Sequence, residues 1–195
     1  MWNERYSASE FAYGTEPNDF LREQAAGLQG PVLCIASGEG RNAVWLAEQG
    51  LEVHGVDSSS VGVDKTLTLA AQRGVTVHAQ VADLATFDFG DNRWGAIVAI
   101  FAHVPPAIRA RVHAAIPGAL RPGGKLVMEM YAPRQLEFRT GGPPSLPMLY
   151  TEDLVRTDMP TLVYDRLEEV ERDVVEGQFH NGRAAVLQVV ASKSG

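Results

Sequence analysis

The most constraining feature of the sequence is the stretch at 31–47, PVLCIASGEGRNAVWLA. Residues 31–36 form a short apolar run typical of a buried strand, and 37–40 (Ser-Gly-Glu-Gly) predict a tight turn. From Arg41 onward the apolar residues have helical spacing. A strand, a glycine turn and a helix in this order bring backbone amides and a helix N-terminus close to a small ligand. We therefore expect the rest of the chain to build a site around Gly38 and Gly40.

Strand and helix patterns alternate along most of the chain. After the first unit we expect strands at 52–56, 75–81, 94–101 and 125–131, separated by helices at 58–73 and about 105–120. The strand at 94–101 is almost entirely apolar, which indicates burial on both faces and a parallel sheet covered by helices on each side. Residues 161–175 and 184–192, joined by a turn at 177–182, predict a terminal antiparallel hairpin. The predicted fold is α/β, with a seven-stranded, mostly parallel sheet.

We expect one domain spanning 1–195, with an N-terminal part at 1–30, a core at 31–131 and a final part at 132–195. Asn18 can cap a short helix in the first part, which is either a surface helix at a sheet edge or a lid of aromatic rings over the glycine turn. Four prolines and two glycines at 132–147 predict a loop, and Pro117 should bend or shorten its helix.

Composition limits the possible partners. The net charge of −7 argues against nucleic acid, whose phosphates require a basic face. Cys34 is the single cysteine, so no internal disulfide can form. The N-terminus has no apolar signal core and no apolar run is long enough for a bilayer, so we expect a cytoplasmic protein acting on a small molecule. A homodimer through an edge strand or the proline-rich loop is possible.

Two cofactors compete for the glycine turn. Residues 38–43, GEGRNA, fit the G-x-G-x-x-G/A dinucleotide pattern, and Asp57 follows about 20 residues later, where an acid can bind two ribose hydroxyls. S-Adenosylmethionine also requires a glycine turn and an acid that binds its ribose. Asp83, at the end of the third predicted strand, favours S-adenosylmethionine because its carboxylate can accept from an adenine amine.

At these residues the chain resembles the class I S-adenosylmethionine-dependent methyltransferases, which have a Rossmann-like seven-stranded sheet. The family's first motif is an acid followed by G-x-G-x-G, and here those positions are Cys34, Ala36, Gly38 and Gly40. LRPGGK at 120–125 matches the loop before the family's fifth strand. GEGRNA and the N-terminal YGTEPN look most like the tellurite-resistance and thiopurine methyltransferase branch.

The resemblance implies a set of cofactor-binding residues and no metal. The expected cofactor contacts are Tyr13, Ala36, Ser37, Gly38, Gly40, Asn42, Asp57, Ser58, Ala82, Asp83, Leu84 and Ile100. The replacement of the motif acid by Cys34 puts the contact to the methionine amino group in question, and it keeps open a non-catalytic S-adenosylmethionine-binding module. An NAD-dependent oxidoreductase is the other alternative.

Four residues are candidates for the acceptor side. His103 follows the fourth predicted strand and has a pKa range suited to a general base, and Tyr131 ends the fifth strand. The resemblance assigns His180 and Arg183, near the terminal turn, to an anionic substrate. A soft nucleophile, such as a thiol or a chalcogen oxyanion, needs no general base, so we expect an acceptor of this kind.

Overall fold

The computed structural model describes residues 1–177 and 179–195, and in this part of the chain seven strands form one sheet. Its order is β3-β2-β1-β4-β5-β7-β6. The strands are β1 (Val32–Ile35), β2 (Val53–Asp57), β3 (His78–Val81), β4 (Trp94–Ile100), β5 (Leu120–Tyr131), β6 (Leu162–Glu176) and β7 (His180–Lys193). Strands β1 to β5 pair in parallel, whereas β7 pairs antiparallel with both β5 and β6. The predicted mostly parallel sheet with a terminal hairpin is confirmed.

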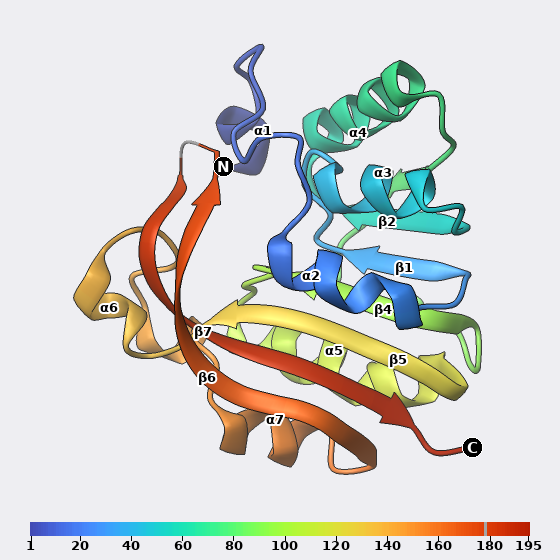
Figure 1. Ribbon diagram of the computed structural model, residues 1–195, viewed down its shortest axis with the longest axis vertical. Helices are drawn as coiled ribbons and strands as arrows, with labels where there is room; N and C mark the ends of the chain where they lie inside the picture. Colours follow the sequence, from blue (N-terminus) through green and yellow to red (C-terminus); the bar gives the residue numbers. More distant parts are fainter. Residues whose placement is uncertain (178) are drawn as a thin grey trace.

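Helices cover both faces of the sheet (Figure 1). They are α1 (Trp2–Arg5), α2 (Asp19–Gln24), α3 (Arg41–Glu48), α4 (Ser60–Arg73), α5 (Pro106–Ala119), α6 (Gln135–Phe138) and α7 (Glu152–Asp158), with 3-10 turns at Ala25–Gly27 and Leu146–Met148. Alternate residues of β1 point to opposite faces, so Cys34 packs with α2, α3 and α4, and Leu33 packs with α5 and α7. None of the helices in the described ranges is long and apolar enough to cross a membrane.

Three helix caps follow from local sequence chemistry. Asn18, Ser59 and Thr151 each accept a hydrogen bond from an amide in the first turn of the helix that follows, as expected for these residue types. Gly74 ends α4 with a left-handed φ of 69°. The helices predicted after Asn18 and at 58–73 are therefore confirmed.

The structure corrects the expected strand and helix limits in two places. Helix α5 continues through Pro117 to Ala119, so this proline, which removes one amide donor, does not shorten the helix. Strand β5 begins at Leu120 rather than at 125, since Leu120 pairs with Trp94 before the register shifts. The predicted turn at 121–124 is thus an irregular part of β5.

The terminal hairpin is longer and its turn shorter than predicted. Strand β6 reaches Glu176 and β7 already begins at His180, and these two residues are paired in the ladder. The predicted turn at 177–182 therefore shrinks, and its residue 178 lies outside the described residues. The end of the hairpin at Glu176 and His180 lies beside the N-terminal segment, whereas the C-terminus lies at the opposite end of β7 (Figure 1).

Candidate active site

Two strained residues mark the carboxyl edge of the sheet. Ala36 (φ 47°) follows β1 and Phe101 (φ 51°) follows β4, and both lie in the left-handed region that non-glycine residues rarely adopt. Strands β1 and β4 are neighbours at the point where the strand order reverses. In open α/β sheets, ligands bind in the crevice at this switch point, and backbone strain tends to gather at such sites.

The N-terminal segment lies over the glycine turn. A Cβ on Gly38 would be 3.0 Å from the Tyr6 hydroxyl oxygen, so the tyrosine ring rests directly on the turn. Lys65 of α4 donates to the carbonyl oxygens of Ala8 and Glu10, and Glu39 of the turn accepts from the Ala12 amide at 2.8 Å. A lid of aromatic rings over the glycine turn requires this contact between the N-terminal segment and the turn.

Gly40 has a packing role. A Cβ at this position would be 2.5 Å from Cγ2 of Thr66, so only glycine lets the start of α3 approach α4 this closely. The left-handed φ of Gly40, 88°, sets the direction of α3 after the turn. The glycine turn is therefore a rigid element between two packed helices.

Asp57 lies at the end of β2 and is only 6% exposed. Its Oδ2 accepts from the Gly38 amide and its Oδ1 from the Ser59 amide, both at 2.8 Å. Burial raises the pKa of Asp57, while these amides act in the opposite direction. Because a carboxylate has about four lone-pair sites, Asp57 keeps acceptor capacity for a diol at the edge of the sheet.

Asp83 lies at the same edge, two residues beyond the register partner of Asp57. Val81 pairs with Asp57 in the β2–β3 ladder, and the Ala82 amide donates to the Asp57 carbonyl oxygen at 2.9 Å. The Asp83 side chain is exposed and its Oδ1 accepts from the Ala85 amide. The two acids thus follow adjacent strands, as the sequence predicted.

The other expected cofactor residues have varied environments. Ser37 Oγ is buried without a hydrogen-bond partner among the described residues and lies 3.0 Å from where a Cβ on Gly55 would be. Asn42 Oδ1 accepts from the Asn18 amide at 2.9 Å and thereby ties α3 to the start of α2. Ser58 is exposed, whereas Leu84 and Ile100 are buried. Burial raises the pKa of the Cys34 thiol to about 12, consistent with a packing role.

His103 is fully engaged with the backbone. Its Nδ1 donates to the Met148 carbonyl oxygen at 2.8 Å, and its Nε2 accepts from the Tyr131 amide at 3.1 Å. Burial lowers the pKa of His103 to about 4. In this arrangement neither ring nitrogen has a lone pair free for an acceptor, so the geometry favours a structural role over that of a general base.

His180 and Tyr131 come together in an aromatic cluster. The His180 ring centroid is 4.5 Å from that of Tyr13, 4.7 Å from Phe101 and 5.4 Å from Tyr131. Phe101 stacks on Tyr131 at 4.5 Å. We call these four residues the aromatic cluster; it lies at the carboxyl ends of β4 and β5. Phe101 was not among the residues expected from the sequence.

Arg183 is not part of this cluster. His180 and Arg183 are three residues apart on β7, so their side chains leave opposite faces of the strand. Arg183 forms an exposed ion pair with Glu171 at 3.3 Å. The joint anion site expected from these two residues is therefore not formed, because His180 begins a strand instead of lying in a turn.

The comparisons with known proteins agree with this geometry. A family model for the methyltransferase domain matches residues 32–124. A curated relative, the 2-heptyl-1-hydroxyquinolin-4(1H)-one methyltransferase of Mycobacteroides abscessus, is 31% identical over 107 residues, which are 53% of this chain and 47% of the relative. The match thus spans about half the length of the curated relative.

Solved structures with the same fold cover nearly the whole chain. A protein solved in a study of the conversion of a disulfide bond into a thioacetal group during echinomycin biosynthesis superimposes with a TM-score of 0.78, at 19% identity, over 98% of this chain and 88% of its own. TehB from Haemophilus influenzae gives 0.74 at 12% identity, over 99% and 66%. The magnesium protoporphyrin IX methyltransferase of Synechocystis PCC 6803, with bound SAH, gives 0.65 at 15%, over 90% and 80%.

Residues 32–124 thus match a methyltransferase domain, and the chain has the fold of methyltransferases of known structure. Its cofactor is S-adenosylmethionine, so the dinucleotide alternative is disfavoured. The residues of the edge fit this group: Asp57 has acceptor capacity for a ribose, and Ser37 Oγ is a buried hydroxyl without a partner. At 12% identity, the likeness to TehB shows the fold and leaves the tellurite-resistance branch a proposal.

A buried network of charges joins the terminal hairpin to the glycine turn. Arg41, the first residue of α3, pairs with Glu176 at the end of β6. Glu176 Oε1 also accepts from Asn18 Nδ2 at 2.8 Å, and Asn18 donates to Glu129 Oε1 at 2.8 Å. Arg172 completes the network with Glu129. Two arginines balance two glutamates, so the network is neutral.

Sequence reasoning missed this network although it left one signal. Glu129 interrupts an otherwise apolar run in β5 (Leu126–Tyr131 in the strand) and is fully buried, which demands a cationic partner. No spacing rule points from Glu129 to Arg172 or from Arg41 to Glu176, because the partners come from separate segments of the chain.

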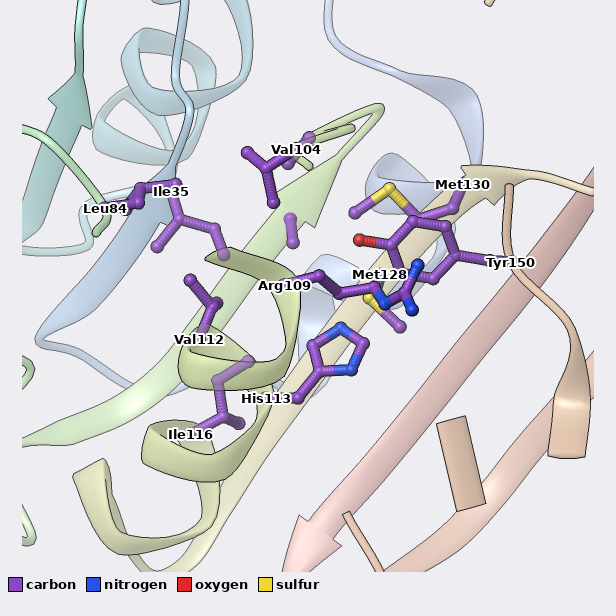
Figure 2. Close-up of a pocket in the computed structure, with 12 residues that line it drawn as sticks. Ile35, Leu84, Val104, Arg109, Val112, His113, Ile116, Met128, Met130 and Tyr150 are labelled. Atoms are coloured by element: carbon purple, nitrogen blue, oxygen red, sulfur yellow. The ribbon is translucent and has the colours of Figure 1, made fainter. Parts of the chain in front are cut away.

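A small cavity lies apart from the acids, between α5 and the sheet (Figure 2). Its volume is about 10 Å³, and most of its lining consists of apolar side chains, among them Ile35 and Met130. At one end lie Arg109, Tyr150 and His113, whose Nδ1 is 2.7 Å from Asp158 Oδ2. The cavity has room for about one water molecule. We therefore regard it as a packing defect of the core.

Proposed function

We propose that this protein transfers a methyl group from S-adenosylmethionine to a small-molecule acceptor. The observation that carries the proposal is the position of Asp57 and Asp83 after adjacent strands, at the edge that also holds the glycine turn and the aromatic cluster. S-Adenosylmethionine supplies the methyl group on a sulfonium, whose departure leaves a neutral thioether. Such a displacement needs mainly orientation and exclusion of water.

The protein's own residues are suited to these two tasks. Asp57 and Ser37 would hold and orient the nucleoside, while Tyr6, lying on Gly38, would keep water from the glycine turn. Asp83 would bind the adenine amine from the neighbouring strand. Cys34 is buried and leaves the methionine amino group to other partners.

For the acceptor we propose a soft nucleophile, and among soft nucleophiles a thiol in preference to a chalcogen oxyanion. An oxyanion needs an available cation, whereas Arg41 and Arg172 near His180 are paired with glutamates, and Arg183 is paired with Glu171 on the other face of β7. The remaining cation near His180, Arg5, is exposed to water and donates to the Tyr13 hydroxyl. An uncharged acceptor suits the neutral, aromatic surroundings of His180 better. This argument counts against membership of the tellurite-resistance branch.

A second candidate acceptor is a hydroxyl group on an aromatic ring. Two observations favour it: the aromatic cluster at the end of β4 and β5, and the named substrate of the curated relative, a hydroxyquinolone. Aromatic rings stack favourably on one another, so the cluster would supply affinity for such an acceptor.

Calorimetry with S-adenosylhomocysteine tests the proposal. We expect binding to the wild-type protein, weaker binding to Asp57→Asn, and unchanged binding to Asp88→Asn, a control in the exposed turn after β3. Mass spectrometry then follows methyl transfer to a thiol, to tellurite and to a hydroxyquinolone. The proposal fails if folded protein does not bind millimolar S-adenosylhomocysteine. Binding without transfer to any acceptor would support a non-catalytic module.

A further inference from the structure

Tyr13 covers His180 with a phenol ring. The two ring centroids are 4.5 Å apart, and the rings are tilted by 50°. Phe101 and Tyr131 approach the imidazole edge-to-face, at 4.7 and 5.4 Å. His180 is therefore enclosed by three aromatic rings, and two of them, Tyr13 and Tyr131, carry a hydroxyl group.

These three rings are anchored very differently. Phe101 and Tyr131 belong to the ends of β4 and β5, and Tyr131 is fully buried. Tyr13 belongs to a stretch between α1 and α2 without helix or strand, and among the described residues its hydroxyl oxygen accepts a hydrogen bond only from the exposed Arg5, at 3.1 Å. Of the three rings, Tyr13 can leave His180 at the lowest cost.

His180 has unused hydrogen-bonding capacity. Its Nδ1 is buried without a hydrogen-bond partner among the described residues, and it lies 4.0 Å from Glu176 Oε2. Glu176 is held in place by Arg41 and Asn18. A shift of about 1 Å would let Nδ1–H donate to Glu176, and in this tautomer Nε2 carries a lone pair that can accept a hydrogen bond.

We propose that the acceptor is a flat aromatic ring with an acidic hydroxyl or thiol group, and that it binds beside His180 in the place that the Tyr13 ring now occupies. This rests on the proposed methyl transfer and names the acceptor class. The acceptor's O–H or S–H donates to His180 Nε2, and the proton moves to that nitrogen as oxygen or sulfur forms its bond to the methyl carbon. The carbon–sulfur bond of the sulfonium breaks, and its electron pair stays on the neutral thioether. Glu176 is the positioning residue that fixes the imidazole.

The charged and titratable groups around His180 are compatible with this role. Glu176 faces it from β6, Arg41 from α3, Arg5 from the N-terminal segment, and His103 from the turn after β4. Burial lowers the pKa of His180, so the imidazole is unprotonated and able to accept at neutral pH. Glu176 and Arg41 neutralise each other, and the remaining positive charge of the exposed Arg5 does not oppose the binding of an uncharged ring.

The test compares the binding of 2-naphthol and 2-methoxynaphthalene by calorimetry, without cofactor or turnover. These ligands have the same ring, but only 2-naphthol can donate a hydrogen bond. We expect the wild-type protein to prefer 2-naphthol by about tenfold, and His180→Phe to lose this preference while it still binds 2-methoxynaphthalene. We expect Tyr13→Ala to bind both ligands at least fivefold more tightly, because the competing ring is gone. His78→Gln, at the far edge of the sheet, is the matched control.

Further variants and one further ligand test the parts of the proposal separately. Glu176→Asp should reduce the preference for 2-naphthol and leave 2-methoxynaphthalene binding unchanged, which a purely structural role would not do. Comparison with 2-naphthalenethiol decides between hydroxyl and thiol. Tyr13→Leu replaces Tyr13→Ala if the latter does not fold. Weaker binding of both ligands by the Tyr13 variants, or an equal preference in wild type and His180→Phe, would overturn the inference. Because S-adenosylhomocysteine binding is measured separately, its loss alone would refute the proposed function and not this one.

Discussion

The Gly38 amide donates to Asp57 Oδ2 across 2.8 Å, so the acid that ends β2 holds the glycine turn that follows β1. The same carboxylate accepts from the Ser59 amide at the start of α4. One side chain thus fixes two backbone segments of the predicted cofactor site before any ligand arrives. This double role makes Asp57 different from Asp83, whose exposed side chain contacts only its own loop.

This difference predicts stability effects of different size from the same substitution. Asp57→Asn should lower the free energy of unfolding by about 1–3 kcal/mol, because two buried amides lose a charged acceptor. Asp83→Asn should change it by less than about 0.5 kcal/mol, as is usual for exposed positions. Both should weaken S-adenosylhomocysteine binding about tenfold or more, as measured by calorimetry. Unchanged affinity in both variants would remove these acids from the cofactor site.

Glu176 should account for much of the folding stability that is lost at acidic pH. Burial alone would raise its pKa, but the His180 ring and the Arg41 and Arg172 guanidinium groups lower it to about 2. A depressed carboxyl pKa contributes stability that is present above the unfolded value of about 4.5 and is lost as the pH falls toward about 2.

Glu176→Gln should therefore cost about 3–5 kcal/mol at pH 7, because it also leaves Arg41 buried without its partner, and the difference from wild type should shrink below about pH 4.5. Urea unfolding at several pH values measures this. Glu169→Gln, exposed on the same strand, is the control. A difference that does not vary with pH would contradict the assignment.

His103 should cause a second loss of folding stability, at a higher pH than the loss caused by Glu176. Burial lowers its pKa to about 4, from an ordinary value of 6.5, so the unfolded chain takes up a proton before the folded one does. Stability from this residue is complete above about pH 6.5 and falls by about 3 kcal/mol as the pH drops toward about 4.

His103→Gln can keep both backbone hydrogen bonds without titrating, so it should flatten the stability curve over this interval. His113 and His180, whose pKa values burial also lowers, contribute to the wild-type curve, and the difference between variant and wild type isolates His103. His54→Gln is the matched control. A ring nitrogen NMR titration of His103 with a midpoint near 6.5 would count against this account.

Replacing Ala36 with glycine should stabilise the fold. Its φ of 47° costs an alanine about 1–2 kcal/mol, whereas glycine adopts it freely and loses part of that gain to the entropy of the unfolded chain. Ala36→Gly should therefore raise the free energy of unfolding by about 0.5–1 kcal/mol. Ala43→Gly, in the buried face of α3, should lower it by about 1 kcal/mol. Urea midpoints compare the two, and destabilisation by Ala36→Gly would show that the strain lies elsewhere.

Local patterns in the sequence were enough to predict the sheet and most helix limits. The apolar run of β4 reports burial on both faces, and the caps Asn18, Ser59 and Thr151 act within one turn of their own helices. The end of each parallel strand is also a local feature. Asp57 and Asp83 could therefore be placed at one edge, because parallel strands bring their carboxyl ends together.

Only the tertiary structure decided which distant groups meet. β7 already begins at His180, so His180 and Arg183 both belong to the strand. Because they are three residues apart, their side chains lie on opposite faces, and Arg183 pairs with Glu171 instead. The partners of Glu176 come from α2, α3 and β7, and no periodicity encodes a contact between segments. The sequence by itself determined the strands, the turn and the two acids through short-range chemistry. The folded chain decided the surroundings of His180, because side-chain contacts between distant segments depend on how the whole sheet packs.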